Sequence, residues 1–255
     1  MMTIVNRSRL SYKIAFAVKH PGQVVPYARR VCVDAWLRAK TRDHVSYYRA
    51  VMKYKAGRSI DMAVGSRSHQ QWLEFGQMQF DYLVKHGLVA TDHMLEVGCG
   101  NLRAGRLFID YLDPGNYYGI DISPDILLAA QDVLTESGLQ DKLPTLTPVR
   151  DLTLTFLPAA YFTVVNANSV FTHCPLPIID ECFAHVGRIM APGGIFDFTF
   201  YRADDAEYDV HREDFYYRTD TLLELARTHG LEARLMDDWH DPYDLQPKIR
   251  LTFPH

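Results

Sequence analysis

An acidic residue and two glycines stand at the end of a short apolar run near the middle of the chain. Glu96 lies within the run Met94–Val97, and Gly98 and Gly100 follow it directly. Glycines at such a point let the backbone turn sharply and let a ligand approach the main chain. Asp121 is the next acidic residue at the end of an expected strand, roughly 20 residues further on, a spacing that suits a carboxylate on the two ribose hydroxyls of a nucleoside.

A dinucleotide is the first candidate ligand for such a turn. A dinucleotide-binding turn would carry a third glycine at residue 103, where this chain has Arg103. The arginine side chain would crowd a turn that binds a pyrophosphate. The two glycines are therefore weak evidence alone, and the interpretation depends on the elements around them.

Short apolar strands alternate with longer helical segments from residue 94 onward. The expected strands cover residues 94–97, 117–121, 145–149, 161–166, 195–201, 231–236 and 248–253. The expected helices cover residues 102–112, 124–137, 177–190 and 219–229, with Pro192-Gly193-Gly194 as a break after the third. This alternation predicts an α/β fold with a doubly wound, mostly parallel seven-stranded sheet. Ligands bind such sheets at the carboxyl ends of the strands, where the glycine turn would lie.

The N-terminal part of the chain is basic and differs from the rest. Residues 1–60 hold 13 of the 27 Lys and Arg residues, but only Asp34 and Asp43 among the 31 acidic residues. We expect residues 1–68 to form a mostly helical extension and residues 69–255 to form the α/β domain. Within the extension, residues 1–22 read as a loose lead ended by Pro21-Gly22, residues 24–56 as helical, and residues 57–68 as a polar linker. The basic residues either are solvated or pair with the acidic domain, or they meet an anionic membrane through residues 1–60.

Two further motifs accompany the glycine turn. Arg150-Asp151 follows the third expected strand, and Ala191-Pro192-Gly193-Gly194 precedes the fifth. This combination resembles the class I S-adenosylmethionine-dependent methyltransferases, over roughly residues 70–253. The resemblance implies a Rossmann-like methyltransferase fold, S-adenosylmethionine as cofactor and S-adenosylhomocysteine as product.

The resemblance also implies which residues hold the methionine part of the cofactor. It assigns that part to the first motif, which consists of Glu96 together with Gly98, Cys99 and Gly100. Asn168, just past the fourth strand, would line the same side.

The nucleoside part is assigned to other strand ends. Asp121 would hold the ribose, and Ile122 would cover the adenine. Asp151 and Leu152 would contact the adenine amino group and ring. Arg103, in place of the third glycine, would either reach the cofactor carboxylate or stay solvated in the first turn of a helix.

A histidine is the expected base, because methyl transfer to a hydroxyl needs an acceptor in line with the methyl group and removal of its proton. His173 follows the fourth strand, His211 lies in the long loop after the fifth, and His240 lies in the last hairpin. We favour His173, because its loop adjoins the methyl end of the cofactor. For each of the three, a packed or surface histidine is the alternative.

The same strand ends argue against several acceptor classes. Asn166-Ala167-Asn168-Ser169 stands where enzymes that methylate nucleic-acid amino groups carry an N-P-P-Y-like tetrapeptide, so a nucleic acid is disfavoured. Cys174-Pro175 reverses the order that cytosine-5 enzymes need. No cluster of His, Asp and Glu has the spacing of a metal site. Aromatic residues of the last loops could line the site of a small acceptor with an apolar, glycosidic or lipid-linked hydroxyl: Tyr208, Phe215, Tyr216, Tyr217, Trp239 and Tyr243.

The expected function is methylation of a small-molecule hydroxyl, on a sugar or lipid-linked acceptor. Two alternatives stay open: a nucleic-acid or protein methyltransferase that uses the basic arm, and a non-catalytic nucleotide-binding protein. A hydrophobic content of 47% predicts a full core. Four scattered cysteines without a C-x-x-C motif, and the lack of an apolar run of about 20 residues, predict a cytoplasmic protein.

Overall fold

The computed structural model describes residues 21–66, 68–243 and 245–253. It divides into two compact units, Met1–Tyr47 and Tyr48–His255, which are described separately. Residues 1–20 of the expected basic lead lie outside the described residues. In the part of the chain that is described, no helix has the length and apolar character needed to cross a membrane.

The described part of the first unit begins with helix α2 (Pro21–Lys40). The expectation that Pro21-Gly22 ends a loose lead is therefore wrong. Proline is favoured at the first position of a helix, because its fixed φ suits the helix and its missing N–H would have no partner there.

Helix α3 (His44–Ala56) follows after a break at residues 41–43. The Asp43 carboxylate accepts a hydrogen bond from the Ser46 N–H at 2.8 Å, which caps the start of α3. Within the first unit, Asp34 accepts hydrogen bonds from Arg38 Nε, at 2.9 Å, and from the Tyr47 hydroxyl. These contacts join the two helices inside this unit.

The second unit is built on the seven-stranded sheet that the sequence predicts. The strand order is β3-β2-β1-β4-β5-β10-β9. The strands from β3 to β5 are parallel, and β10 is antiparallel to both neighbours. The strands are β1 (Met94–Val97), β2 (Tyr117–Asp121), β3 (Thr145–Pro148), β4 (Phe162–Ala167), β5 (Met190–Thr199), β9 (Glu232–Met236) and β10 (Lys248–Thr252).

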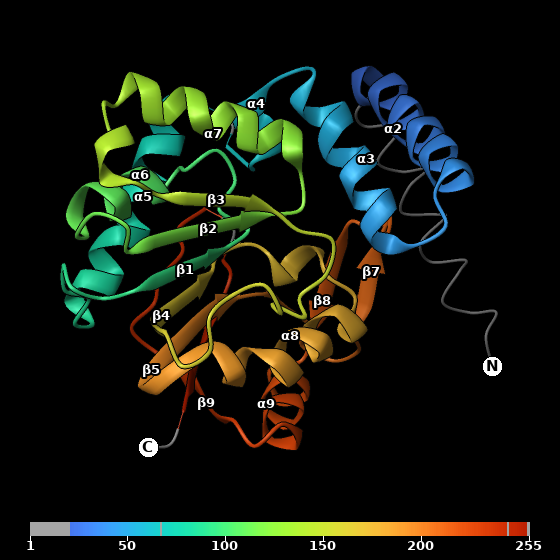
Figure 1. The fold of residues 1–255 in the computed structure, drawn as a ribbon. Coiled ribbons are helices and arrows are strands. Elements are labelled where there is room, and N and C mark those ends of the chain that lie inside the picture. The colour runs from blue at the N-terminus through green and yellow to red at the C-terminus, as the bar shows by residue number, and fades with distance from the viewer. Residues whose placement is uncertain (1–20, 67, 244, 254–255) are drawn as a thin grey trace. The chain divides into compact units, whose positions relative to one another are not determined.

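Helices cover both faces of this sheet (Figure 1). An apolar cluster that includes Phe108 and Leu127 packs α5, α6 and α7 on one face. A second cluster, which includes Phe183 and Leu222, packs α8 and α9 on the other face. The helices are α4 (Ile60–Ala63), α5 (His69–Lys85), α6 (Gly105–Tyr111), α7 (Pro124–Glu136), α8 (Leu176–Ile189) and α9 (Thr219–Thr228), with short 3₁₀ turns η1 (Gln140–Lys142) and η2 (Phe171–His173).

Strand β5 differs from its prediction at its start. Pro192-Gly193-Gly194 was expected to separate helix from strand, but the three residues lie inside β5, and α8 ends earlier, at Ile189. The pairing of β4 with β5 shifts register between Phe162 and Val164. Such an irregularity lets a strand accommodate proline and glycine, and that is why the expected break is wrong.

The long loop expected after β5 is a second, three-stranded sheet in the order β6-β8-β7. Its strands are β6 (Tyr201–Arg202), β7 (Tyr208–Val210) and β8 (Asp214–Tyr217). His211 and Arg212 both have positive φ, 55° and 54°, and the Glu213 N–H donates to the Val210 carbonyl at 3.0 Å. Three residues, 211–213, thus connect the paired Val210 and Asp214, and the first two of them have positive φ. The residues of this connection, His-Arg-Glu, include no glycine or asparagine, so the sequence did not reveal the turn.

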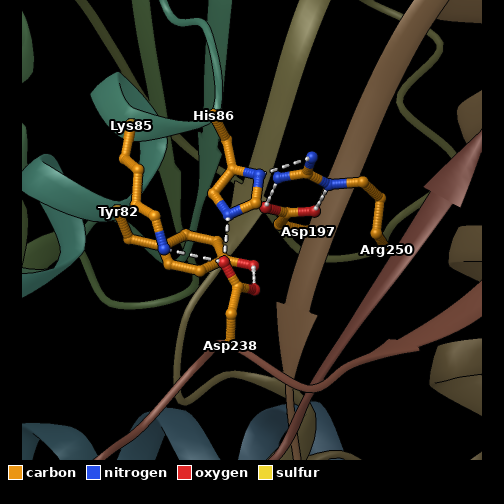
Figure 2. A network of polar contacts seen from close by, with 6 residues as sticks. All are labelled: Tyr82, Lys85, His86, Asp197, Asp238 and Arg250. Carbon is orange, nitrogen blue, oxygen red and sulfur yellow. Dashed lines mark hydrogen bonds and ion pairs between the residues drawn. The ribbon is translucent and has the colours of Figure 1, made fainter.

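A network of charged side chains holds the end of α5 against the main sheet (Figure 2). The buried Asp197 of β5 receives two hydrogen bonds from Arg250 of β10, from Nε and Nη2, each at 2.6 Å. His86 lies between this pair and Asp238, with Nδ1 3.3 Å from Arg250 Nη1 and Nε2 2.9 Å from Asp238 Oδ2. Lys85 also donates to Asp238, at 3.0 Å. The two-point guanidinium contact compensates the burial of the Asp197 charge.

Candidate cofactor and active site

The turn after β1 requires glycine for two reasons. Gly98 and Gly100 have φ values of +69° and +57°, in the left-handed region. A Cβ on Gly98 would also clash with the Val170 side chain. The N–H groups of Gly98 and Cys99 both donate to the Ile120 carbonyl, at 2.7 and 3.0 Å, which fixes the turn to the end of β2. Glycine is therefore needed at residue 98 both for the backbone conformation and because Val170 fills the space of a side chain.

Asp121 ties the same turn to β2 through its carboxylate. Oδ2 accepts the Gly100 N–H at 3.0 Å, and Oδ1 accepts the Ser123 N–H at 2.8 Å. Burial raises the pKa of Asp121 to about 6, although these backbone N–H groups favour the charged form. Each carboxylate oxygen can accept a second hydrogen bond. Asp121 is thus positioned by the chain and retains acceptor capacity for two hydroxyl groups.

Ser123 caps the start of helix α7, close to the start of the predicted helix 124–137. Its hydroxyl oxygen accepts the Ile126 N–H at 3.4 Å, and Pro124 follows at the first helical position. Ile122, between Asp121 and Ser123, is half-buried. The stretch that should hold a ribose is therefore fixed at a helix start.

Glu96 is buried beneath the turn. The Tyr117 hydroxyl donates to Glu96 Oε2. A Cβ on Gly105 would be 3.0 Å from that oxygen, so the start of α6 packs closely on the carboxylate. Burial raises the pKa of Glu96 to about 7, and the Tyr117 hydrogen bond and the charge of Arg103 act in the opposite direction.

Arg103 occupies the position of the absent third glycine. The preceding residue, Leu102, has a φ of +62°, so the left-handed turn is made by a leucine. Arg103 Nη1 donates to the Val64 carbonyl at 2.9 Å, and its guanidinium lies 4.5 Å from the centre of the Phe75 ring. The side chain therefore holds the segment after α4 to this loop. Its role toward a cofactor carboxylate stays a prediction.

Asp151 and Leu152 lie just after β3. Asp151 is exposed, and its Oδ1 accepts the Thr153 N–H at 3.1 Å. The Leu152 side chain is buried, and its N–H donates to Glu181 Oε2 at 2.8 Å. Their contact with an adenine stays a prediction.

Asn168 lies where β4 ends, beside the segment that precedes β10. It is buried, and among the described residues its Oδ1 has no hydrogen-bond partner. Ser169, with a φ of +59°, donates from its N–H to Thr199 Oγ1 at 2.7 Å and from its hydroxyl to Gln246 Oε1 at 3.1 Å. The ends of β4 and β5 are thus held together around an unsatisfied buried oxygen, which favours a ligand that donates hydrogen bonds.

His173 lies in η2, one turn beyond Asn168. Its Nδ1 is 2.7 Å from the Glu213 carbonyl oxygen and 3.2 Å from Asp214 Oδ1. A carbonyl oxygen can only accept, so Nδ1 carries the proton and Nε2 is the basic nitrogen of the neutral ring. The ring stacks on Tyr48 at a centroid distance of 5.2 Å. A carboxylate and a carbonyl therefore fix both the orientation and the tautomer of His173.

Helix α3 contributes residues to the second unit that the sequence did not point to. Lys55 forms an ion pair with the buried Glu213, at 2.9 Å. Burial and then nearby acidic groups, including Asp121 and Asp214, raise the pKa of Tyr48. Tyr48 therefore lies close to both the expected ribose carboxylate and the carboxylate beside His173. No local pattern could have indicated this, because Tyr48 reaches the site through the fold alone.

The other two candidate bases lie elsewhere. His211 is part of the β7–β8 turn, and His240 is exposed between β9 and β10. The structure places His173 beside an acidic partner at the strand ends. Catalytic roles for all three stay predictions.

The strand order and the glycine turn are those of the Rossmann-like methyltransferase fold. Residues 95–196 match the family model described as "Methyltransferase domain". This part of the chain is therefore similar to that methyltransferase family.

Similar proteins agree with this assignment. The chain is 27% identical, over 161 residues, to "Probable methyltransferase ltbC" from Aspergillus luteorubrus, a match that covers 62% of this chain and 53% of that protein. The matched part of the chain thus spans about half the length of this curated relative.

Two solved structures show the same fold. One is magnesium protoporphyrin IX methyltransferase from Synechocystis PCC 6803 with bound S-adenosylmethionine (TM-score 0.62, 16% identity, 83% of this chain and 98% of that chain covered). The other is phosphoethanolamine N-methyltransferase 2 from Haemonchus contortus (TM-score 0.61, 14% identity, 85% and 61% covered).

Proposed function

We propose that the protein transfers a methyl group from S-adenosylmethionine to a hydroxyl of a small molecule, such as a sugar or a lipid-linked acceptor. The observation that carries the proposal is the joining of the Gly98–Gly100 turn to Asp121, with His173 at the same strand ends. The names of the two structural neighbours describe small acceptors, which supports a small acceptor here.

The described residues fit the cofactor. The glycine turn lies against the end of β2, and Asp121 has acceptor capacity for both ribose hydroxyls. The unsatisfied Asn168 oxygen suits the ammonium group of the methionine part. When bound, the cofactor supplies a sulfonium methyl group, which is electrophilic, and S-adenosylhomocysteine is the product.

His173 is proposed to remove the proton from the acceptor hydroxyl. Asp214 and the Glu213 carbonyl hold its Nδ1, so Nε2 is the nitrogen that takes the proton. Asp214 then stabilises the imidazolium that forms, because opposite charges at this distance attract. A positioned base contributes about 10²–10⁴-fold to the rate. His211 and His240 are the substitutes if His173 does not act.

Calorimetry tests the proposal at the level of the cofactor. The protein should bind S-adenosylmethionine and S-adenosylhomocysteine and should not bind NAD. Tight NAD binding without binding of either methionine cofactor would overturn the proposed function.

We also propose that helix α2 contacts an anionic membrane surface. Val25, Val31 and Trp36 are 75%, 38% and 55% exposed on a helix that carries basic residues. Lys40 Nζ lies 4.0 Å from the centre of the Trp36 ring, so a cation sits beside the exposed aromatic group. Exposed apolar residues flanked by basic ones are typical of helices that bind at a lipid interface.

Vesicle sedimentation tests the membrane proposal. The protein should bind vesicles that contain phosphatidylglycerol. High salt should weaken this binding, because it screens the attraction that contributes about 1 kcal/mol of binding free energy per basic residue. Trp36→Ser should weaken binding, whereas Leu128→Ser, which changes an exposed leucine of α7, should not. Equal binding to neutral phosphatidylcholine vesicles, or no effect of Trp36→Ser, would contradict this part of the proposal.

A further inference from the structure

Gln246 brings a side-chain amide to the end of β5 from the last part of the chain. It lies two residues before Lys248, the first residue of β10, which pairs with Thr199 at the end of β5. The Gln246 side chain is buried, and its main-chain carbonyl accepts the Trp239 indole N–H at 2.9 Å. Gln246 is therefore fixed beside the strand ends that form the candidate site.

The hydrogen bonds around Gln246 each have a defined direction. The Ser169 N–H can only donate, so Thr199 Oγ1, 2.7 Å away, accepts from it. In the described part of the chain, the Thr199 hydroxyl has one further partner, the Gln246 side chain at 2.7 Å. A buried hydroxyl hydrogen is seldom left unpaired, so Thr199 donates to Gln246 Oε1. The Ser169 hydroxyl donates to the same oxygen, at 3.1 Å.

These directions determine how the Asn168 amide is oriented. The Ser169 hydroxyl gives its one hydrogen to Gln246, so toward Asn168 it can only accept. Asn168 Nδ2 is the group that donates to it, at 3.2 Å. The Asn168 oxygen is thereby directed away from Ser169, and among the described residues it is buried and has no hydrogen-bond partner. This acceptor suits a ligand that donates hydrogen bonds.

The orientation of the Asn168 amide matters because the methionine part of the cofactor carries an ammonium group. An ammonium group has three donors and no acceptor. Asn168 Oδ1 can accept from it, whereas a reversed amide would present the donor Nδ2 to a cation. Without the Gln246 oxygen, the Ser169 hydroxyl could donate to Asn168 Oδ1, and this contact would favour the reversed amide.

We infer that Gln246 is a positioning residue that keeps the Asn168 oxygen available to the cofactor ammonium group and so makes the site selective for a ligand that carries this group. The inference rests on the proposed function and adds a residue that acts through Ser169 and Asn168. Gln246 lies 78 residues beyond Asn168 in the sequence, since 246 − 168 is 78. The selectivity of the β4 end thus depends on the last connection of the main sheet.

Two matched ligands test the inference on the full chain. S-adenosylhomocysteine carries the ammonium group, and 5′-S-(3-carboxypropyl)-5′-thioadenosine has a hydrogen in its place. Calorimetry should show about tenfold tighter binding of S-adenosylhomocysteine to the unaltered protein, because hydrogen bonds to charged groups are the stronger ones. Gln246→Leu should weaken S-adenosylhomocysteine binding about tenfold and should change the affinity for the deaminated ligand by less than about twofold.

Three further variants serve as controls. Gln246→Glu retains an oxygen that accepts from both hydroxyl groups, so it should bind S-adenosylhomocysteine at least as tightly as the unaltered protein. Asn168→Ala removes the oxygen itself, and adding Gln246→Leu to it should cause no further loss, because both residues act through one contact. Gln131→Leu makes the same change at an exposed position of α7 and should leave both affinities unchanged.

The outcomes separate this inference from the proposed function. Equal binding of the two ligands to the unaltered protein, or equal weakening of both by Gln246→Leu, overturns the inference while S-adenosylhomocysteine still binds. If Gln246→Leu fails to fold, Ser169→Gly decides, because it removes the same hydroxyl link at a position of positive φ that glycine tolerates. It should weaken the binding of S-adenosylhomocysteine alone. Failure of the unaltered protein to bind either ligand would instead overturn the proposed function.

Discussion

Asp121 is the residue whose contacts make the cofactor interpretation most directly testable. Asp121→Ala removes the carboxylate that accepts the Gly100 and Ser123 N–H groups. We expect affinity for S-adenosylhomocysteine to fall at least tenfold, because one charge-assisted hydrogen bond contributes about 1.5–3 kcal/mol. Calorimetry measures the change, and Asp132→Ala, at an exposed position of α7, is the matched control. Unchanged affinity in Asp121→Ala would contradict the assigned role.

His173 should affect turnover and not cofactor binding. We expect His173→Ala to lower kcat by about 10²–10⁴-fold, measured with radiolabelled cofactor and an acceptor that the unaltered protein methylates. Affinity for S-adenosylhomocysteine should stay within about twofold in the same variant. A kcat equal to that of the unaltered protein would show that His173 is not the base. His211 and His240 would then be the remaining candidates.

Single residues differ in how well the sequence revealed them. Gly98, Gly100 and Asp121 were predicted because their positions, directly after one strand and at the end of the next, can be recognised in the local sequence. Asp214 was missed because its strand was too short to recognise within an acidic segment, and Tyr48 because it reaches the site from far upstream in the chain. Contacts made by tertiary packing leave no periodic trace in one sequence.

Among the elements, the end of α3 and helix α4 pack against other elements of the second unit, to which they belong. Met52 packs in one apolar cluster with Ala63 and Ile126, and Lys55 pairs with Glu213. The sequence predicted helix in this region, but it placed residues 57–68 in a linker. Residues 60–63 are helical because their apolar members pack in the same cluster.

Two shortened chains test this attachment. A chain that begins at Tyr48 should retain the stability and cofactor affinity of the full chain. A chain that begins at Ser59 exposes Ile126 and leaves the buried Glu213 without Lys55, so it should lose about 3–5 kcal/mol in its free energy of unfolding. Urea denaturation measures both. Equal stability of the two chains would show that residues 48–58 do not support the site.

At the scale of the whole molecule, two buried carboxyl groups should make stability depend on pH. Burial raises the pKa of Glu96 from 4.5 to about 7 and that of Asp121 from 3.8 to about 6. Between these values the folded protein retains protons that the unfolded chain has released, so stability decreases as pH rises through this range. For Glu96 the difference corresponds to about 3 kcal/mol.

Denaturation at several pH values measures this effect. The free energy of unfolding should decrease from pH 5 to pH 7.5 in the protein without cofactor, and Glu96→Gln should reduce the decrease. Glu136→Gln, which alters an exposed residue of α7, should leave it as it is. A free energy of unfolding that rises over this range would show that Glu96 is ionised in the folded protein well below pH 7.

The overall fold was predicted more completely than the site. All seven strands of the main sheet and their alternation with helices were expected, because strand burial on both faces and helix periodicity are strong local signals. The antiparallel placement of β10 and the ionic network around Arg250 were not expected, because strand order is a property of the assembled sheet.

The position of β10 affects how the chain folds while it is being translated. β10 lies between β5 and β9, although it is the last of the seven strands to be synthesised. Asp197 emerges 53 residues before Arg250, its buried partner. At about 5–20 residues per second, the nascent chain spends several seconds with one edge of β5 unpaired and one carboxylate uncompensated. Slow codons between these two positions would lengthen that interval, so the rate of translation there should influence how much of the newly made chain aggregates.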